Sequence, residues 1–251
     1  MKLANVVAFR RGKDVSLTLL VTALTCMVLA IWSPKALAVV VGQIDTFEDG
    51  TTQHWFAGGP FGVPPHPPLN QPSGGPLGVD DNYLQLASTG TFTAGGRLVA
   101  INGTQWSGDY VDAGITRISM DLRNIGNTDL TVRLYLENPI LGVSAPTDTA
   151  LSEALFLPAG GGWTHTEFAL DPASLTMLQG DADALLTDVG LLRLIHGPDA
   201  VFPPPFIAGL LGVDNIRALG NVTAIPEPTT LALLGIGLAG LAFRRRNRAA
   251  D

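Results

Sequence analysis

The sequence has little of what disulfide chemistry or nucleic-acid binding requires. Of its 251 residues one is cysteine, Cys26, and only 15% are charged, against roughly 25% in typical soluble domains. A single cysteine excludes a disulfide within the chain. Lysine is absent between Val39 and Ile225, where six arginines face 19 acidic residues, a difference of −13. Because nucleic-acid-binding surfaces are basic, we expect no nucleic-acid partner.

Familiar catalytic motifs are also missing. The sequence contains no G-x-S-x-G, no H-E-x-x-H and no P-loop. Glycosidases need two carboxylates at a defined separation, and no spacing singles out a pair among the acids. The sequence therefore predicts a protein that is not an enzyme and has no organic cofactor.

The first 38 residues are typical of an export signal. Four cations precede the uncharged stretch from Val15 to Ser33, and Ala36-Leu37-Ala38 is an A-x-A cleavage pattern. Cleavage after this pattern leaves Val39 as the mature N-terminus and a mature chain without cysteine. Because the apolar stretch is longer than usual, an uncleaved membrane anchor is the alternative.

Residues 225–251 have the pattern of a membrane segment with a stop signal. Pro226, Glu227 and Pro228 precede an uncharged run of 15 residues, 229–243, and a cluster of arginines follows it: Arg244, Arg245 and Arg246. As a helix the run spans roughly 22 Å, which is short for a hydrocarbon core of about 30 Å. Arginines after such a run mark the cytoplasmic side.

This order of Pro-Glu-Pro, short apolar helix and arginine cluster resembles the PEP-CTERM sorting domain. The resemblance implies an exported protein that is held in the inner membrane until an exosortase-type enzyme recognises Pro226, Glu227 and Pro228 and processes it. The processed protein then belongs to the cell surface or the extracellular matrix, with exopolysaccharide and biofilm. A plain tail anchor is the alternative.

Between the two signals, residues 39–224 are predicted to form an all-β domain, an antiparallel β-sandwich or jelly roll with one short helix. Apolar and polar residues alternate in 117–123 and 131–137, which predicts two strands paired as a hairpin. A helix is predicted between Asp171 as its cap and Gly180 as its end. Weaker strands are predicted at 43–47, 83–88, 96–101, 154–157, 164–170, 191–196 and 213–219.

Three short motifs in this domain resemble galactose-binding-like jelly rolls, a superfold that includes many carbohydrate-binding modules. They are Asp45-Thr46-Phe47-Glu48-Asp49-Gly50 followed by Trp55, Gly162-Trp163 followed by Phe168 and Leu170, and Gly212-Val213-Asp214-Asn215-Ile216-Arg217. The resemblance implies that the first and last strands lie side by side and share a structural Ca²⁺.

The calcium ligands implied by this resemblance are Asp214 with Glu48 or Asp45, because Ca²⁺ prefers carboxylate and carbonyl oxygens. The alternative is that Asp214 and Asn215 only hydrogen-bond within a turn.

Sugar binding requires aromatic planes that are exposed to solvent. The candidate residues are Trp55, Trp106, Tyr110 and Tyr135, and the alternative for the tryptophans is packing in the core. The sequence thus predicts a non-enzymatic surface or matrix protein with a glycan-binding β-sandwich whose partner is exopolysaccharide. The alternatives are a structural adhesin with a protein partner and a hydrolase of matrix polysaccharide.

Overall fold

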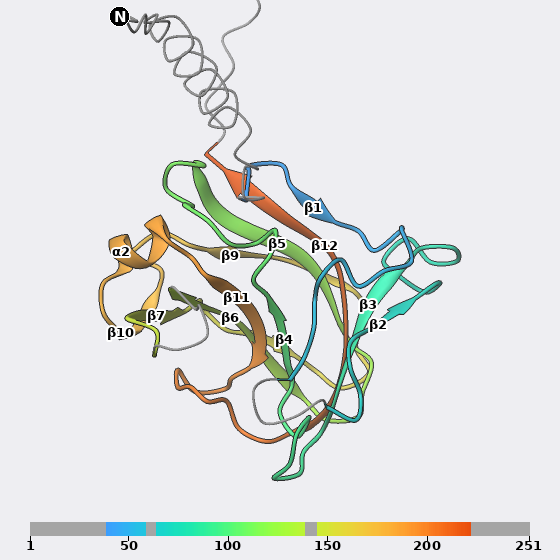
Figure 1. The fold of residues 1–251 in the computed structure, drawn as a ribbon. Coiled ribbons are helices and arrows are strands. Elements are labelled where there is room, and N and C mark those ends of the chain that lie inside the picture. The colour runs from blue at the N-terminus through green and yellow to red at the C-terminus, as the bar shows by residue number, and fades with distance from the viewer. Residues whose placement is uncertain (1–38, 59–63, 139–144, 222–251) are drawn as a thin grey trace, which may run out of the picture. The chain divides into compact units, whose positions relative to one another are not determined.

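The computed structural model describes residues 39–58, 64–138 and 145–221. They form an antiparallel β-sandwich of two sheets, which confirms the predicted fold class (Figure 1). Both predicted terminal signals lie outside the described residues. Within those residues, no helix has the length and apolar character needed to cross a membrane.

The first sheet, sheet A, is built around the longest strand, β12. Its order is β2-β3-β12-β5-β9, and β1 pairs with β12 as well. The strands are β1 (Ile44–Asp45), β2 (Leu69–Gln71), β3 (Tyr83–Thr89), β5 (Ile115–Asn124), β9 (Thr164–Ala169) and β12 (Ala208–Gly220). The pairing of β1 with β12 confirms that the first and last strands lie side by side.

The second sheet, sheet B, has the order β10-β7-β6-β11-β4, with β8 paired to β6. Its strands are β4 (Val99–Asn102), β6 (Leu130–Asn138), β7 (Asp148–Leu151), β8 (Leu155–Leu157), β10 (Thr176–Gln179) and β11 (Leu191–His196). An isolated antiparallel bridge also joins Phe56 to Ile101 of β4.

Apolar side chains from alternate positions of the two sheets meet in one core. The inward residues of β5 and β6 are fully buried: Ile118, Met120, Leu122, Val132, Leu134 and Leu136. Each such side chain stabilises the fold by about 1.5–3 kcal/mol relative to exposure. The alternation in the sequence therefore correctly identifies which face of each strand is buried.

The predicted hairpin between 117–123 and 131–137 does not form, because β5 belongs to sheet A and β6 to sheet B. β5 pairs with β12 and β9, whereas β6 pairs with β11, β7 and β8. Asn124 holds the connection by donating to the carbonyl oxygens of Thr128 (2.9 Å) and Leu157 (3.0 Å). The alternation of apolar and polar residues specifies only which face of a strand is buried. That face is the same whether the chain turns back within one sheet, as in a hairpin, or crosses to the other sheet.

The helix also lies later than predicted. Asp171 does accept a backbone hydrogen bond from Ser174 (3.2 Å), but the chain then enters β10, which pairs with the edge of β7. Helix α2 spans Ala182–Thr187, and its N-cap Asp181 accepts from the backbone nitrogen of Ala184 (3.0 Å). Pairing with an open sheet edge therefore prevails over the local capping signal.

Candidate functional site

The two tryptophans predicted as sugar platforms are instead buried around a carboxylate. Trp106 is 0% exposed and Trp55 2%. Each indole nitrogen donates to Oδ2 of Asp45, at 2.7 Å in both cases. Gln105 donates to the same carboxylate at 3.3 and 3.4 Å. This cluster joins β1 to the segment after β4, so its role is structural.

The two predicted tyrosine platforms are buried as well. Tyr110 is fully buried, and its hydroxyl donates to the carbonyl oxygen of Trp106 (2.8 Å). Tyr135 is 3% exposed and lies under Phe202, with ring centroids 4.1 Å apart. Burial raises the pKa of both phenols. The prediction that these four aromatic residues are exposed is therefore wrong, because segments distant in sequence cover them.

The three predicted calcium ligands each make their own contacts within the protein, although Glu48 lies near enough to Asp214 for its charge to raise the pKa of Asp214. Burial raises the pKa of Asp45, although the hydrogen bonds from Trp106, Trp55 and Gln105 oppose this rise. Those donors occupy the carboxylate oxygens of Asp45, whose role as a calcium ligand stays a prediction. Glu48 instead accepts from the backbone nitrogen of Asn82 (2.9 Å).

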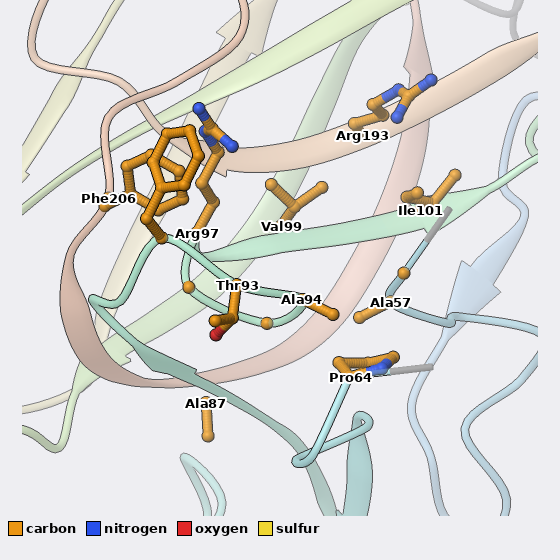
Figure 2. A pocket seen from close by; sticks show the side chains of 14 residues that line it. Ala57, Pro64, Ala87, Thr93, Ala94, Arg97, Val99, Ile101, Arg193 and Phe206 are labelled. Atoms are coloured by element: carbon orange, nitrogen blue, oxygen red, sulfur yellow. The ribbon is translucent and has the colours of Figure 1, made fainter. Parts of the chain in front are cut away.

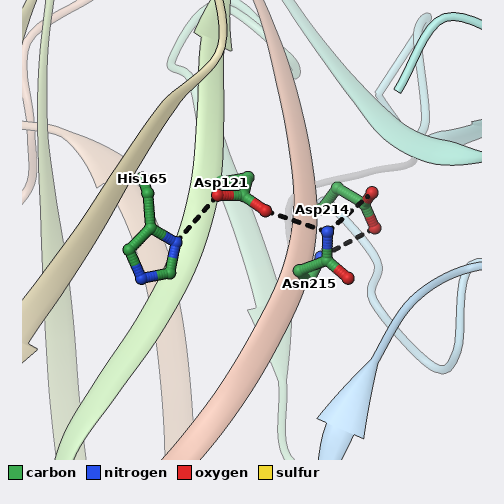
Figure 3. A network of polar contacts seen from close by, with 4 residues as sticks. All are labelled: Asp121, His165, Asp214 and Asn215. Carbon is green, nitrogen blue, oxygen red and sulfur yellow. Dashed lines mark hydrogen bonds and ion pairs between the residues drawn. The ribbon is translucent and has the colours of Figure 1, made fainter. Parts of the chain in front are cut away.

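Asp214 belongs to a polar network on sheet A (Figure 3). Asn215 has a left-handed φ of 51° at a register shift in β12, and its side chain donates to Asp214 (3.2 Å) and Asp121 (2.9 Å). Asp121 also lies 2.8 Å from Nδ1 of His165. Burial raises the pKa of Asp214 to about 7, and the nearby charges of Asp81, Asp121 and Glu48 act in the same direction.

No group of three or more His, Cys, Asp or Glu side chains within the described residues is arranged to hold a metal ion. The hydrogen bonds between Asp214 and Asn215 match the turn alternative stated above. Calcium binding stays a prediction.

The described residues do form an open pocket, and it lies at the β4 edge of sheet B (Figure 2). Its volume is about 590 Å³. Val99, Ile101 and Arg193 project into it from β4 and β11. The full lining is Ala57, Gly58, Pro64, Ala87, Phe92, Thr93, Ala94, Gly95, Gly96, Arg97, Val99, Ile101, Arg193 and Phe206.

Aromatic rings and a guanidinium form one wall of this pocket. Phe92 is 89% exposed, and its ring centroid lies 4.9 Å from that of Phe206. The Cζ atom of Arg97 lies 3.7 Å from the Phe206 ring centroid, and its Nε donates to the carbonyl oxygen of Pro204. Such cation–π contacts hold a guanidinium in place.

A second arginine reaches the pocket from the outer face of sheet B. Ile101, Arg193 and Tyr135 lie side by side across β4, β11 and β6. Arg193 forms an ion pair with Glu137, which is 2% exposed, and it lies 5.4 Å from the ring of Phe202. The positive charge of Arg193 is therefore balanced by a buried carboxylate.

Sequence reasoning missed all the polar and aromatic residues of this pocket. Phe92 is a lone large apolar residue in a run of threonine and glycine, and this was the one local signal for exposure. Arg97, Arg193 and Phe206 carry no such signal, because they meet only through the pairing of β11 with β4 and the return of the chain into β12.

Solved structures that are similar to this chain include carbohydrate-binding modules. The chain is similar to a family 11 carbohydrate-binding module from Clostridium thermocellum, solved with a β-1,3-1,4-mixed-linked tetrasaccharide (14% identity, TM-score 0.47, 72% of this chain, 97% of that chain). It is also similar to an exo-β-agarase (12% identity, TM-score 0.49, 72% of this chain, 25% of that chain). A third similar structure is a C-terminal family 22 carbohydrate-binding module from Clostridium thermocellum (14% identity, TM-score 0.41, 73% of this chain, 96% of that chain). The strand pairing itself defines the class of the described residues, an antiparallel β-sandwich of two sheets.

At the C-terminus, the family described as PEP-CTERM protein-sorting motif matches residues 224–246. This chain therefore carries a PEP-CTERM sorting motif, which implies an exported protein sorted by an exosortase. The resemblance drawn from Pro226, Glu227, Pro228 and the arginine cluster is confirmed. No curated protein matches the chain.

Proposed function

We propose that this protein is exported, is processed by an exosortase-type enzyme, and binds glycan at the cell surface or in a biofilm matrix without catalysing a reaction. The pocket beside Phe92 and Phe206 is the observation that carries this proposal. The sorting motif supports the destination, since a matrix protein meets exopolysaccharide there.

The pocket offers the surfaces that a sugar ring needs. The C–H groups of a pyranose ring pack on aromatic faces, and hydroxyl groups need a few polar partners around an apolar floor. The phenyl ring of Phe92 costs free energy while it faces water, and a ligand that covers it recovers that cost.

The loop that presents Phe92 is held by the backbone. The backbone nitrogen of Thr89 donates to the carbonyl oxygen of Gly95 (2.9 Å), and the backbone nitrogen of Gly96 donates to the carbonyl oxygen of Thr93 (3.0 Å). A preorganised loop loses less conformational entropy when a ligand binds. The pocket is therefore suited to binding without a large rearrangement.

The test is affinity electrophoresis of the full chain in detergent against a panel of soluble neutral and acidic polysaccharides. Phe92→Ala is expected to weaken binding about tenfold, because an aromatic contact contributes about 1.5 kcal/mol. Phe156→Ala is the matched control, since Phe156 is 60% exposed on β8 and does not line the pocket. Wild-type protein that binds no glycan, or a Phe92→Ala variant that binds like wild type, contradicts the proposal.

The same experiment separates the two alternative functions. No Asp or Glu is among the described residues that line the pocket, which supports binding rather than hydrolysis. Release of reducing ends from any polysaccharide of the panel would favour the hydrolase. A chain that binds no glycan but binds a matrix protein through Phe92 would favour the adhesin.

The sorting proposal has its own test in the host. Changing Pro226, Glu227 and Pro228 to alanine is expected to leave an unprocessed, membrane-held form, visible as a larger band in the membrane fraction. Changing Thr229 and Thr230 to alanine is the control and should leave processing intact. Release of the Pro-Glu-Pro variant at the wild-type rate would overturn the proposal.

A further inference from the structure

The charges of the pocket differ from those of the rest of the sandwich. Between Val39 and Ile225 the sequence has six arginines, no lysine and 19 acidic residues. Two of these arginines line the pocket, and no acidic residue does so among the described residues. The segment 59–63, which joins Gly58 to Pro64, also has no charged residue in its sequence. A positive pocket in so acidic a domain suits a negatively charged ligand.

Arg97 is placed to bind an anion. Its Nε donates to Pro204, and the flat face of its guanidinium lies on Phe206. Within the described residues its two terminal nitrogens have no hydrogen-bond or ion-pair partner in the protein. A guanidinium held in this way offers two parallel N–H groups, which match the two oxygens of a carboxylate.

We propose that the pocket selects a glycan that carries isolated carboxylates, such as single uronic acid residues among neutral sugars, and that Arg97 binds the carboxylate while Phe92 and Phe206 contact the sugar ring. This inference rests on the proposed glycan binding and names the class of glycan.

Arg193 does not supply this selectivity. Its Nε lies 3.1 Å from Oε1 of Glu137, and the two side chains form an ion pair on the outer face of sheet B. The pair is neutral as a unit, so it can donate hydrogen bonds to hydroxyl groups but adds little attraction for an anion. The selectivity for charge therefore depends on Arg97.

The excess of acidic residues explains why the carboxylates must be sparse. A domain with a charge difference of −13 repels a densely charged polyuronate over the Debye length, about 8–10 Å at moderate ionic strength. A neutral chain with occasional uronic acids brings one carboxylate to Arg97 and few others near the acidic surface. The pocket is therefore matched to a weakly acidic polysaccharide.

The experiment compares three probes with the full chain in detergent: glucuronoxylan, the same polymer after chemical reduction of its carboxyl groups, and polygalacturonate. Wild-type protein is expected to bind glucuronoxylan about tenfold more tightly than the reduced polymer, the effect of one charged hydrogen-bonding contact. It should also bind glucuronoxylan more tightly than polygalacturonate at low salt.

Variants assign the preference to one residue. Arg97→Gln is expected to bind native and reduced glucuronoxylan equally, and Arg97→Lys should keep part of the preference as a point charge. Arg123→Gln is the matched control, because Arg123 also donates through Nε to a backbone oxygen, that of Gly161 (3.2 Å), but does not line the pocket. It changes the net charge equally and should keep the preference.

Three results would overturn the inference. Equal binding of native and reduced glucuronoxylan by the wild type removes the charge selectivity and leaves glycan binding standing. An Arg97→Gln variant that keeps the preference assigns it to another residue. Tighter binding of polygalacturonate refutes the role of the acidic surface. Binding of none of the probes here or of the wider panel contradicts the proposed function itself.

Discussion

Replacement of Asp45 by alanine is expected to lower the free energy of unfolding by about 3 kcal/mol. The variant removes the acceptor of two indole hydrogen bonds of 2.7 Å, from Trp55 and Trp106. A hydrogen bond to a charged group contributes about 1.5–3 kcal/mol, and an unsatisfied buried donor costs about 1–3 kcal/mol. Relief of the desolvated carboxylate offsets part of the loss. Two indole hydrogen bonds at the lower limit of about 1.5 kcal/mol each give the expected loss of about 3 kcal/mol.

The isosteric variant Asp45→Asn separates the hydrogen bonds from the charge. Both indoles donate to the same oxygen, Oδ2, so an amide oxygen in that place keeps both bonds. Its amide nitrogen then replaces Oδ1, so only the weak hydrogen bond from Nε2 of Gln105 to that oxygen (3.4 Å) is lost. We expect Asp45→Asn to stay within about 1 kcal/mol of wild type.

The assay is urea unfolding of the full chain in mild detergent, followed by tryptophan fluorescence, because two of the protein's four tryptophans contact Asp45. The alanine variant should also melt about 6–12 °C lower. Chelation of divalent ions should not change the difference from wild type. An alanine variant within about 0.5 kcal/mol of wild type, or one whose defect appears only when calcium is present, would refute the reasoning.

The pH dependence gives a further check on the same site. Burial raises the pKa of Asp45 above its ordinary 3.8 in the folded state. As the pH rises above 3.8, the unfolded chain loses this proton before the folded one does, so this group lowers stability with rising pH up to the folded pKa. The Asn variant lacks this contribution. Its stability relative to wild type should therefore increase across that window.

Three further predictions concern other buried groups. The pKa of Asp214 is raised from 3.8 to about 7, so the free energy of unfolding of wild type should fall by up to roughly 4 kcal/mol relative to Asp214→Asn as the pH rises through that range. Urea unfolding measures this, and an equal pH profile for both proteins would refute it. Stabilisation of wild type alone by calcium would support the calcium prediction. Nδ1 of His196 accepts a hydrogen bond from the backbone nitrogen of Thr131 (3.0 Å), and burial lowers the pKa of His196 below 6.5. Because the unfolded chain binds a proton before the folded one does, wild type should lose stability as the pH falls below 6.5. The His196→Gln variant should not show this loss. Leu134→Ala empties a fully buried position of β6 and should cost about 2–5 kcal/mol in the same assay; a cost below about 1 kcal/mol would contradict the position of this side chain in the core.

The local features of this protein follow from its sequence. The period of two in β5 and β6 correctly gave the buried positions Ile118 to Leu122 and Val132 to Leu136, because side-chain direction in a strand depends only on neighbouring residues. The sorting motif is likewise a short linear pattern, and it was identified from the residues alone.

The pairing of the strands and the exposure of the aromatic residues were decided by the tertiary structure. Whether β5 pairs with β6 depends on which other strand edges are available. In the folded protein β5 pairs with β12, and β6 pairs with β11. Whether Trp106 faces water depends on a segment 61 residues away in the chain, since Asp45 of β1 lies against it. No periodicity encodes such a contact.

The pocket shows the same division most clearly. Phe92, Arg97, Arg193 and Phe206 come from three separate parts of the chain, and each alone is an ordinary surface or strand residue. The antiparallel register of β11 against β4, and the path of the chain into β12, bring them to one edge of sheet B. The sequence by itself therefore determined the sorting motif and the buried faces of the strands, whereas only the packing of distant segments decided which residues form the pocket.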